Sequence, residues 1–156
     1  MSTSIRLHVA ADRQIMLGLI RELQEAERAI HESRLPGDEV AELCYGRLLD
    51  RAAEILIAEV DGQPVGFVSG WLDEDADPLQ TSEWRRHGHV SDLFVAAPWR
   101  GRGIGQQLLK AIGQRLQRMG ARRLRICTLA VNAKAVESFR RFGFAPFEIT
   151  FDRPLP

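Results

Sequence analysis

Alternation of apolar and polar residues predicts most strands of this chain. Ile5, Leu7 and Val9 alternate with polar neighbours, which is the pattern of a strand with one buried face. Apolar runs or the same alternation recur at five later places. Those predicted strands span residues 55–58, 65–72, 89–96, 124–129 and 147–152. Asp61-Gly62 stands between the first two of them, and this dipeptide favours the tight turn of a β-hairpin.

Apolar residues at spacings of three and four predict the helices. They are expected over residues 12–30, 38–49, 104–119 and 132–142. Asp12 and Asp38 are suited to cap the first two, and Gly120 and Gly143 end the last two because glycine readily adopts the left-handed conformation. The order of elements predicts a single α/β domain over residues 1–156 with a mixed sheet.

Composition indicates the class of protein. Of the 156 residues, 45% are hydrophobic and 27% are charged, as in soluble globular proteins. The chain shows neither an N-terminal signal segment nor an apolar run of the roughly 20 residues that span a membrane. Cys44 and Cys127 have no metal-ligand spacing and no histidine close by in the sequence. We therefore expect a cytoplasmic domain with two reduced thiols, no metal and no membrane contact.

A net charge of zero conceals a division along the chain. Residues 1–80 carry 7 basic and 16 acidic side chains, whereas residues 81–156 carry 14 basic and 5 acidic ones. Such segregation indicates two faces with partners of opposite charge, one anionic and one cationic. We do not expect nucleic acid as the anion, because no zinc spacing or RNA-binding aromatic motif accompanies the arginines.

The predicted strand at residues 89–96 leads into a loop rich in arginine and glycine. Gly101, Gly103 and Gly105 allow tight backbone turns and leave N–H groups accessible where the next helix begins. These free donors and the partial positive charge of a helix N-terminus favour a phosphate, and Arg100 and Arg102 add formal charge. The loop therefore predicts a polyanionic ligand.

Two common phosphate-binding motifs are absent from this loop. A P-loop carries Gly-Lys-Ser/Thr at the start of its helix, where this chain has Ile104-Gly105-Gln106. A dinucleotide-binding fingerprint needs a third glycine at position 106 and an acidic residue about 20 positions later, where arginines stand instead. Neither NTP chemistry nor a dinucleotide cofactor is therefore expected.

Two blocks of sequence resemble the signatures of the GNAT acyltransferase superfamily. The first joins Val95, Pro98 and Trp99 to the loop at residues 100–105, in the order of that family's acyl-CoA-binding motif. The second, at residues 132–144, has an Asn-Ala pair, an aromatic residue and a Gly-Phe pair at the family's spacing. The resemblance implies an acyl-CoA, acetyl-CoA above all, as acyl donor and a primary amine as acceptor.

This resemblance also implies a fold and a mechanism. In the family, a mostly antiparallel sheet of six to seven strands is flanked by about four helices. The strand before the glycine loop and the strand after its helix splay apart, and acyl-CoA lies in the wedge between them. The amine then attacks the thioester directly in a ternary complex.

The residues implied for binding acyl-CoA lie in both blocks. They are Leu93, Phe94, Val95, Arg100, Gly101, Arg102, Gly103, Ile104, Gly105, Gln106, Asn132 and Phe139. The backbone N–H of Val95 is implied as the catalytic donor to the tetrahedral oxyanion. Asn132 is also suited to cap the helix that it begins, and one side chain can do both.

The acceptor side requires a base, because an alkylammonium ion with a pKa of about 10.4 is not a nucleophile. His89 is the predicted base, since imidazole titrates near neutral pH and family members often carry Glu or His at this position. Asp92, His87 and Glu83 remain alternatives. Strand alternation predicts one face made of His89, Ser91, Leu93 and Val95, opposite Val90, Asp92 and Phe94.

The chain departs from the family at the group that protonates the leaving thiolate. A tyrosine commonly stands at position 139, where Phe139 here keeps the ring without the hydroxyl. Tyr45 or water could supply the proton, or a thiolate with a pKa near ~8.5 could leave without an acid. This departure keeps a second interpretation open, that of a catalytically weak acyl-CoA sensor or interaction domain.

The sequence does not reveal which amine is the acceptor. Its determinants are expected in residues 12–50 and 73–88, where no motif is present; Trp71 stands just before the second segment and Trp84 within it. The acidic half of the chain predicts a cationic small molecule or peptide. A homodimer is left open.

Overall fold

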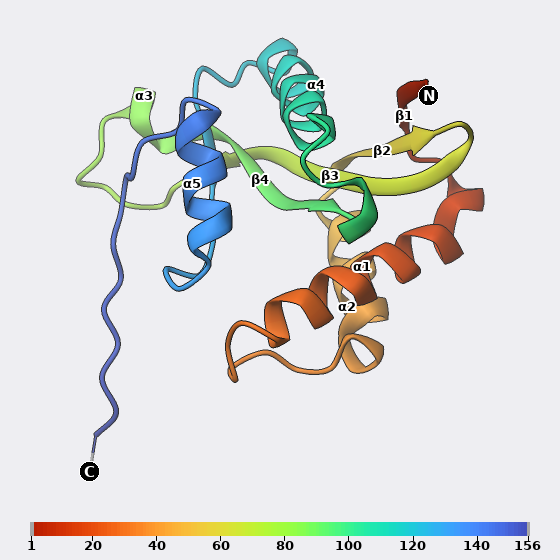
Figure 1. Ribbon diagram of the computed structural model, residues 1–156. Coiled ribbons are helices and arrows are strands. Elements are labelled where there is room, and N and C mark those ends of the chain that lie inside the picture. Colours follow the sequence, from red (N-terminus) through yellow and green to blue (C-terminus); the bar gives the residue numbers. More distant parts are fainter. Residues whose placement is uncertain (1, 156) are drawn as a thin grey trace.

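The computed structural model describes residues 2–155 and contains one mixed five-stranded sheet (Figure 1). Its strand order is β1-β2-β3-β4-β5, in which the first four strands are antiparallel and β5 runs parallel to β4. The strands are β1 (Thr3–Leu7), β2 (Glu54–Val60), β3 (Gln63–Glu74), β4 (Arg86–Val95) and β5 (Leu124–Ile126).

Helices cover both faces of this sheet. The first two lie on one face and the fourth crosses the other, as Figure 1 shows. They are α1 (Arg13–Arg28), α2 (Gly37–Asp50), α3 (Ser82–Arg85), α4 (Ile104–Arg118) and α5 (Ala133–Arg141). Short 3₁₀ turns at Ala10–Asp12 and Ala97–Trp99 precede α1 and the glycine loop. The four long helices confirm the helical periodicity of the sequence.

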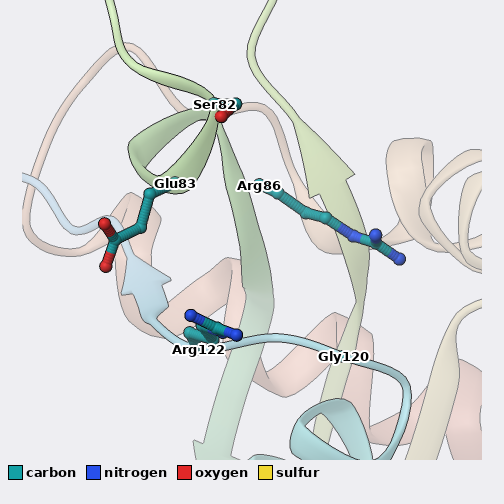
Figure 2. Close-up of a pocket in the computed structure, with 5 residues that line it drawn as sticks. All are labelled: Ser82, Glu83, Arg86, Gly120 and Arg122. Atoms are coloured by element: carbon teal, nitrogen blue, oxygen red, sulfur yellow. The ribbon is translucent and has the colours of Figure 1, made fainter.

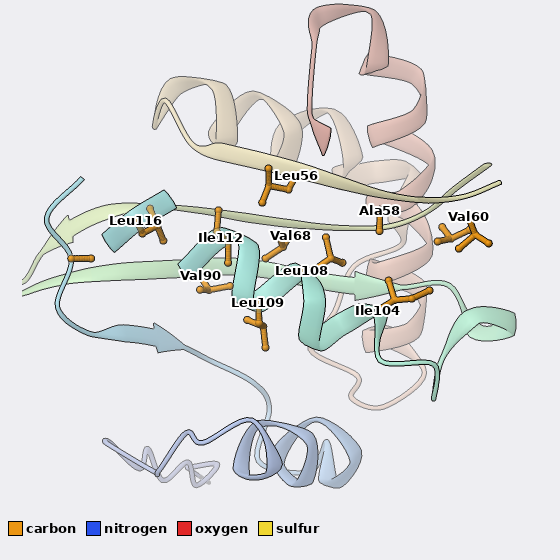
Figure 3. Packing of buried hydrophobic residues seen from close by; sticks show 12 residues of the cluster. Leu56, Ala58, Val60, Val68, Val90, Ile104, Leu108, Leu109, Ile112 and Leu116 are labelled. Atoms are coloured by element: carbon orange, nitrogen blue, oxygen red, sulfur yellow. The ribbon is translucent and has the colours of Figure 1, made fainter. Parts of the chain in front are cut away.

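A hydrophobic cluster lies on each face of the sheet. Under α4, Leu108 and Ile112 pack with Val90 of β4, and all three are fully buried (Figure 3). On the opposite face, Met16 of α1 and Phe67 of β3 belong to a second cluster with α2. Each such side chain contributes roughly 1.5–3 kcal/mol by leaving water, so the two clusters fix α1, α2 and α4 to the sheet.

Turn residues stand where the sequence predicted them. Asp61 and Gly62 both have positive φ angles, 49° and 82°, as the tight turn between β2 and β3 requires. Gly120 and Gly143, with φ angles of 103° and 90°, end α4 and α5. The predicted cap at Asp12 is only half right. Asp12 occupies the N-cap of α1, but its carboxylate accepts hydrogen bonds from the Arg6 guanidinium and the Val9 N–H.

The sheet has fewer strands than the six to seven expected. The segment at 147–152 was predicted as a final strand, but in the structure it is extended chain without a strand partner. Its alternation is correct for a strand, yet a strand exists only where a neighbouring backbone completes its ladder. Asp38 also differs from its prediction, since α2 begins one residue earlier and Pro36 is its N-cap. No helix within residues 2–155 is long and apolar enough to cross a membrane.

Candidate functional site

Strands β4 and β5 pair over only three residues and then part. Gly88, His89 and Val90 align with residues 124–126, and no pairing continues beyond them. On its other side β4 stays paired with β3 up to Val95. On the side that faces β5, the backbone of residues 91–95 therefore has no paired strand within the described chain. A ligand with amide groups could bond to this edge as a strand would.

The glycine loop lies directly beyond this free edge. Gly101 and Gly103 have φ angles of 76° and 78°, a conformation that a Cβ atom makes costly, and Gly103 is the N-cap of α4. A Cβ added at either position would meet no atom within 4 Å. The loop is therefore open to solvent, and the first turn of α4 presents its N–H groups there.

The two loop arginines pack against the end of β4 and the turn after it. The Arg100 Nε donates a hydrogen bond of 2.7 Å to the carbonyl of Val95, and its guanidinium lies 5.7 Å from the Phe94 ring centroid. The Arg102 guanidinium lies 4.9 Å from the centroid of Trp99. The Arg100 side chain thus lies against the end of β4, and that of Arg102 lies against the turn that precedes the glycine loop.

An extra residue in β4 overturns the predicted alternation. Asp92 aligns with Ser69 of β3 and Val90 aligns with the adjacent Gly70, so Ser91 is a β-bulge. Beyond the bulge the side chains exchange faces. Val90 shares the α4 face with Leu93 and Val95, whereas His89 and Phe94 share the face of α1 and α2. The candidate base therefore points to the opposite face from Leu93, contrary to the prediction.

His89 lies in a compact cluster with residues of β3. Its ring lies 4.6 Å from that of Trp71, centroid to centroid, and 6.4 Å from that of His87. Asp73, His87 and His89 carry donor atoms that all lie within 4.8 Å of one another, a set that could also accept a metal ion. Burial lowers the pKa of His89, and the nearby carboxylates of Asp73 and Asp92 only partly oppose this effect. The ring is therefore held neutral near pH 7.

The three alternative bases occupy different environments. His87 is buried, and its Nδ1 is 2.8 Å from the Arg85 carbonyl. Asp92 accepts a 2.6 Å hydrogen bond from the hydroxyl of buried Ser69. Glu83 lies on α3 and lines a surface cavity of about 380 Å³ with Ser82, Arg86, Gly120 and Arg122 (Figure 2). That cavity lies beyond the C-terminal end of α4, whereas the glycine loop lies at its N-terminal end.

The second sequence block forms α5 and the residues around it. Asn132 is its N-cap, and its side chain accepts a 3.2 Å hydrogen bond from the N–H of Ala135, which confirms the predicted cap. Phe139 is half-buried on α5, with its ring centroid 6.0 Å from that of Phe144. The structure does not bring Tyr45 to this region. Its hydroxyl lies 2.9 Å from His8 Nε2, at the opposite edge of the sheet, so it is not placed as a substitute acid.

Sequence reasoning missed the roles of two polar residues of β3 at this site. Ser69 fixes the carboxylate of Asp92, and Asp73 lies beside His89. A visible signal existed for Ser69, because a hydroxyl within an apolar strand usually has a polar partner when it is buried. The fold and the site together define an α/β protein whose strands part beside a glycine-lined helix start.

Comparisons with known proteins agree with this class. The family model of the acetyltransferase (GNAT) family matches residues 17–144. The thialysine N-epsilon-acetyltransferase of Bos taurus is 31% identical over 135 residues, which cover 82% of this chain and 75% of that protein. An uncharacterized N-acetyltransferase of Methanocaldococcus jannaschii is 31% identical over 93 residues, which cover 60% of this chain but only 39% of that protein.

A solved structure shows the same fold. The aminoglycoside N-acetyltransferase AAC(6')-Iy in complex with CoA has a TM-score of 0.76 and 23% sequence identity, with 98% of this chain and 95% of that chain covered. The family match over residues 17–144, together with the relative that is 31% identical over 82% of this chain, shows that the chain belongs to the acetyltransferase (GNAT) family. The resemblance of its two sequence blocks to that family is confirmed.

Proposed function

We propose that this protein is an acyl-CoA-dependent N-acyltransferase that uses acetyl-CoA and a cationic primary amine. The observation that carries the proposal is the free edge of β4 at residues 91–95, which leads directly to the open N-terminus of α4. One ligand with amides at one end and phosphates at the other suits both features, and acyl-CoA has this composition. CoA in the complex of AAC(6')-Iy, which has the same fold, supports the choice of ligand.

In the proposed complex, the pantetheine amides of acetyl-CoA bond to the backbone of Leu93 and Val95. The pyrophosphate oxygens accept hydrogen bonds from the backbone N–H groups of residues 103–106, and Arg100 and Arg102 lie beside them. The Val95 N–H donates to the thioester oxygen, and its hydrogen bond strengthens as negative charge develops there. Phe94 contributes backbone only, since its ring is buried in the core with α1 and α2. Asn132 and Phe139 approach from α5.

His89 is the proposed base. Its neutral imidazole removes a proton from the ammonium group of the acceptor, directly or through one water, and the amine nitrogen then attacks the thioester carbon. A C–N bond forms and the C–S bond breaks. The nitrogen loses its second proton, and the departing CoA thiolate takes up a proton in turn. The carboxylates of Asp73 and Asp92 near His89 favour a cationic acceptor on this face. We place the reaction in the cytoplasm, a location that the free thiols of Cys44 and Cys127 support.

The experiment that tests this function is transfer from acetyl-CoA to a panel of amines. The panel includes an aminoglycoside, a polyamine, thialysine and an amine-bearing peptide, and release of CoA thiol is followed together with the mass of the acetylated product. We expect at least one cationic amine to gain an acetyl group at a rate above that of hydrolysis. Tight CoA binding without transfer to any amine would instead support the alternative function, an acyl-CoA sensor, which the missing hydroxyl at Phe139 favours.

A further inference from the structure

Three side chains that can bind a metal converge on one face of β3 and β4. The two strands lie side by side (Figure 1), and their register pairs Asp73 with His87 and Trp71 with His89. The two histidines stand two residues apart in an unbroken stretch of this ladder, so both point to the same face as Asp73. The donor atoms of the three side chains all lie within 4.8 Å of one another. Strand pairing thus brings together three ligands that lie apart in the sequence.

Two of these side chains are held as metal ligands usually are. A metal-binding histidine commonly donates its other ring N–H to a carbonyl, which fixes the ring. The Nδ1 of buried His87 lies 2.8 Å from the Arg85 carbonyl. Because a carbonyl only accepts, Nδ1 carries the proton and Nε2 keeps its lone pair. One oxygen of Asp73 accepts a 3.0 Å hydrogen bond from the N–H of Glu74, which orients the carboxylate.

His89 completes the set at a position that solvent reaches. Its ring packs 4.6 Å from that of Trp71, and the side chains of His89 and Asp73 are only partly buried. An ion can therefore enter from the surface, and a water molecule can occupy a fourth position on it. The Asp92 carboxylate adds negative charge near His89 and offsets the Arg51 guanidinium, which lies 5.5 Å from the Trp71 ring centroid.

The chemistry of the three donors selects among metal ions. Two imidazole nitrogens and one carboxylate oxygen suit zinc, which binds three protein ligands and a water in open tetrahedral sites. Magnesium and calcium prefer sites made of oxygen ligands. Ligand atoms around a tetrahedral zinc ion lie about 3.4 Å apart, so modest side-chain rotations bring the three donors into range. We propose that Asp73, His87 and His89 form a binding site for one zinc ion.

Zinc at this site inhibits the proposed reaction. A metal-bound ring nitrogen has no lone pair for a proton, so zinc on His89 blocks the proposed base. Acetyl-CoA keeps its proposed site, because Leu93 lies on the other face of β4. The inhibition rests on the proposed function, whereas zinc binding does not. A zinc site differs from the expectation of no metal, which considered only the spacing of Cys44 and Cys127.

Calorimetric titration with zinc chloride tests the site without any enzymatic reaction. The full chain, free of an affinity tag and dialysed first against EDTA and then against plain buffer, should bind one zinc ion per chain. Magnesium chloride should give no binding at the same concentrations. Asp73→Asn keeps the size of the side chain but removes its charge, so zinc affinity should fall at least about tenfold. Circular dichroism checks that this variant keeps the fold.

The matched control for Asp73→Asn is Glu74→Gln. Glu74 is the next residue of β3, so its side chain points to the opposite face, and this variant should bind zinc like the parent. Absence of zinc binding by the parent would overturn the proposal. Equal zinc affinity in Asp73→Asn and the parent would place the ion elsewhere and would overturn it as well.

Inhibition is measured with the amine that the panel identifies as acceptor. Zinc at the concentration of its dissociation constant should halve the formation of acetylated product, and excess EDTA should restore it. Glu74→Gln should be inhibited like the parent, whereas Asp73→Asn should need at least about ten times more zinc. Full transfer with zinc bound would overturn the inhibition and the role of His89 as base. If no amine is acetylated, the proposed function fails, and the calorimetric titration still decides the zinc site.

Discussion

At the scale of single residues, His89 is distinguished by its surroundings. Its ring packs against that of Trp71 at a tilt, it shares a cluster with Asp73 and His87, and burial lowers its pKa. A lower pKa makes imidazole a weaker base but keeps it in the neutral form that can accept a proton. The same cluster places negative charge near the site where a cationic amine would lose that proton. Both effects favour base catalysis at neutral pH.

The variant His89→Gln should lower turnover about 10²–10⁴-fold, the range for removal of a general base. Calorimetric titration should give the same acetyl-CoA affinity as the parent, since the ring faces away from Leu93. The control His31→Gln removes an exposed histidine and should change neither quantity. In the parent, the rate should rise with pH as His89 loses its proton, with the midpoint below the ordinary histidine value of about 6.5. Unchanged turnover in His89→Gln would shift the role to Asp92 or an ordered water.

Phe139 is the residue where this chain and its family differ. Its ring is half-buried on α5, so a hydroxyl at its tip changes little in the packing. If protonation of the CoA thiolate limits the rate, Phe139→Tyr supplies a donor and turnover should rise several-fold, as measured by thiol release at saturating substrates. The matched variant Phe139→Leu removes the ring without adding a donor and should not accelerate transfer. Equal rates in Phe139→Tyr and the parent would show that attack or product release limits turnover.

At the scale of elements, the proposed ligand site lies where β4 meets α4. The bulge at Ser91 turns His89 toward α1 and α2 and Leu93 toward α4, so the proposed base and the proposed ligand lie on opposite faces of one strand. Beyond the bulge β4 separates from β5, and the glycine loop follows the end of this free edge.

The start of α4 provides a test that separates charge from backbone strain. Gly103→Asp and Gly103→Asn should incur similar strain at a φ of 78°, because Asp and Asn are the non-glycine residues best tolerated there. Only Gly103→Asp places a carboxylate where the pyrophosphate is proposed to bind. Calorimetry should therefore show at least a tenfold greater loss of acetyl-CoA affinity for Gly103→Asp, and the difference should shrink in high salt. Equal affinities in the two variants would argue against a phosphate at this helix start.

The sequence predicts these elements unequally well. Helical periodicity and the glycines that end the helices predict the bounds of α4 and α5 to within a few residues, because both signals are local. The bulge at Ser91 depends on pairing with β3, and the unpaired segment at 147–152 depends on whether a neighbouring backbone is present. Neither condition is encoded in the alternation itself, which is why the predicted faces of β4 and the final strand were wrong.

At the scale of the whole molecule, the charge division follows the order of the sheet. The acidic half of the chain builds β1, α1, α2, β2 and β3, and the basic half builds β4, α4, β5 and α5. The two halves meet at the pairing of β3 with β4, where the His89 cluster lies. This arrangement suits a reaction that brings an anionic donor and a cationic acceptor together from opposite sides.

The distance from the CoA sulfur to the Phe139 ring tests this account most directly. A crystal structure of the protein with bound CoA would measure it. We predict that the pantetheine arm lies along residues 91–95, the pyrophosphate at the first turn of α4, and the sulfur beside Phe139. A sulfur more than about 8 Å from that ring, well beyond hydrogen-bond reach, or CoA bound away from the free edge of β4, would contradict it.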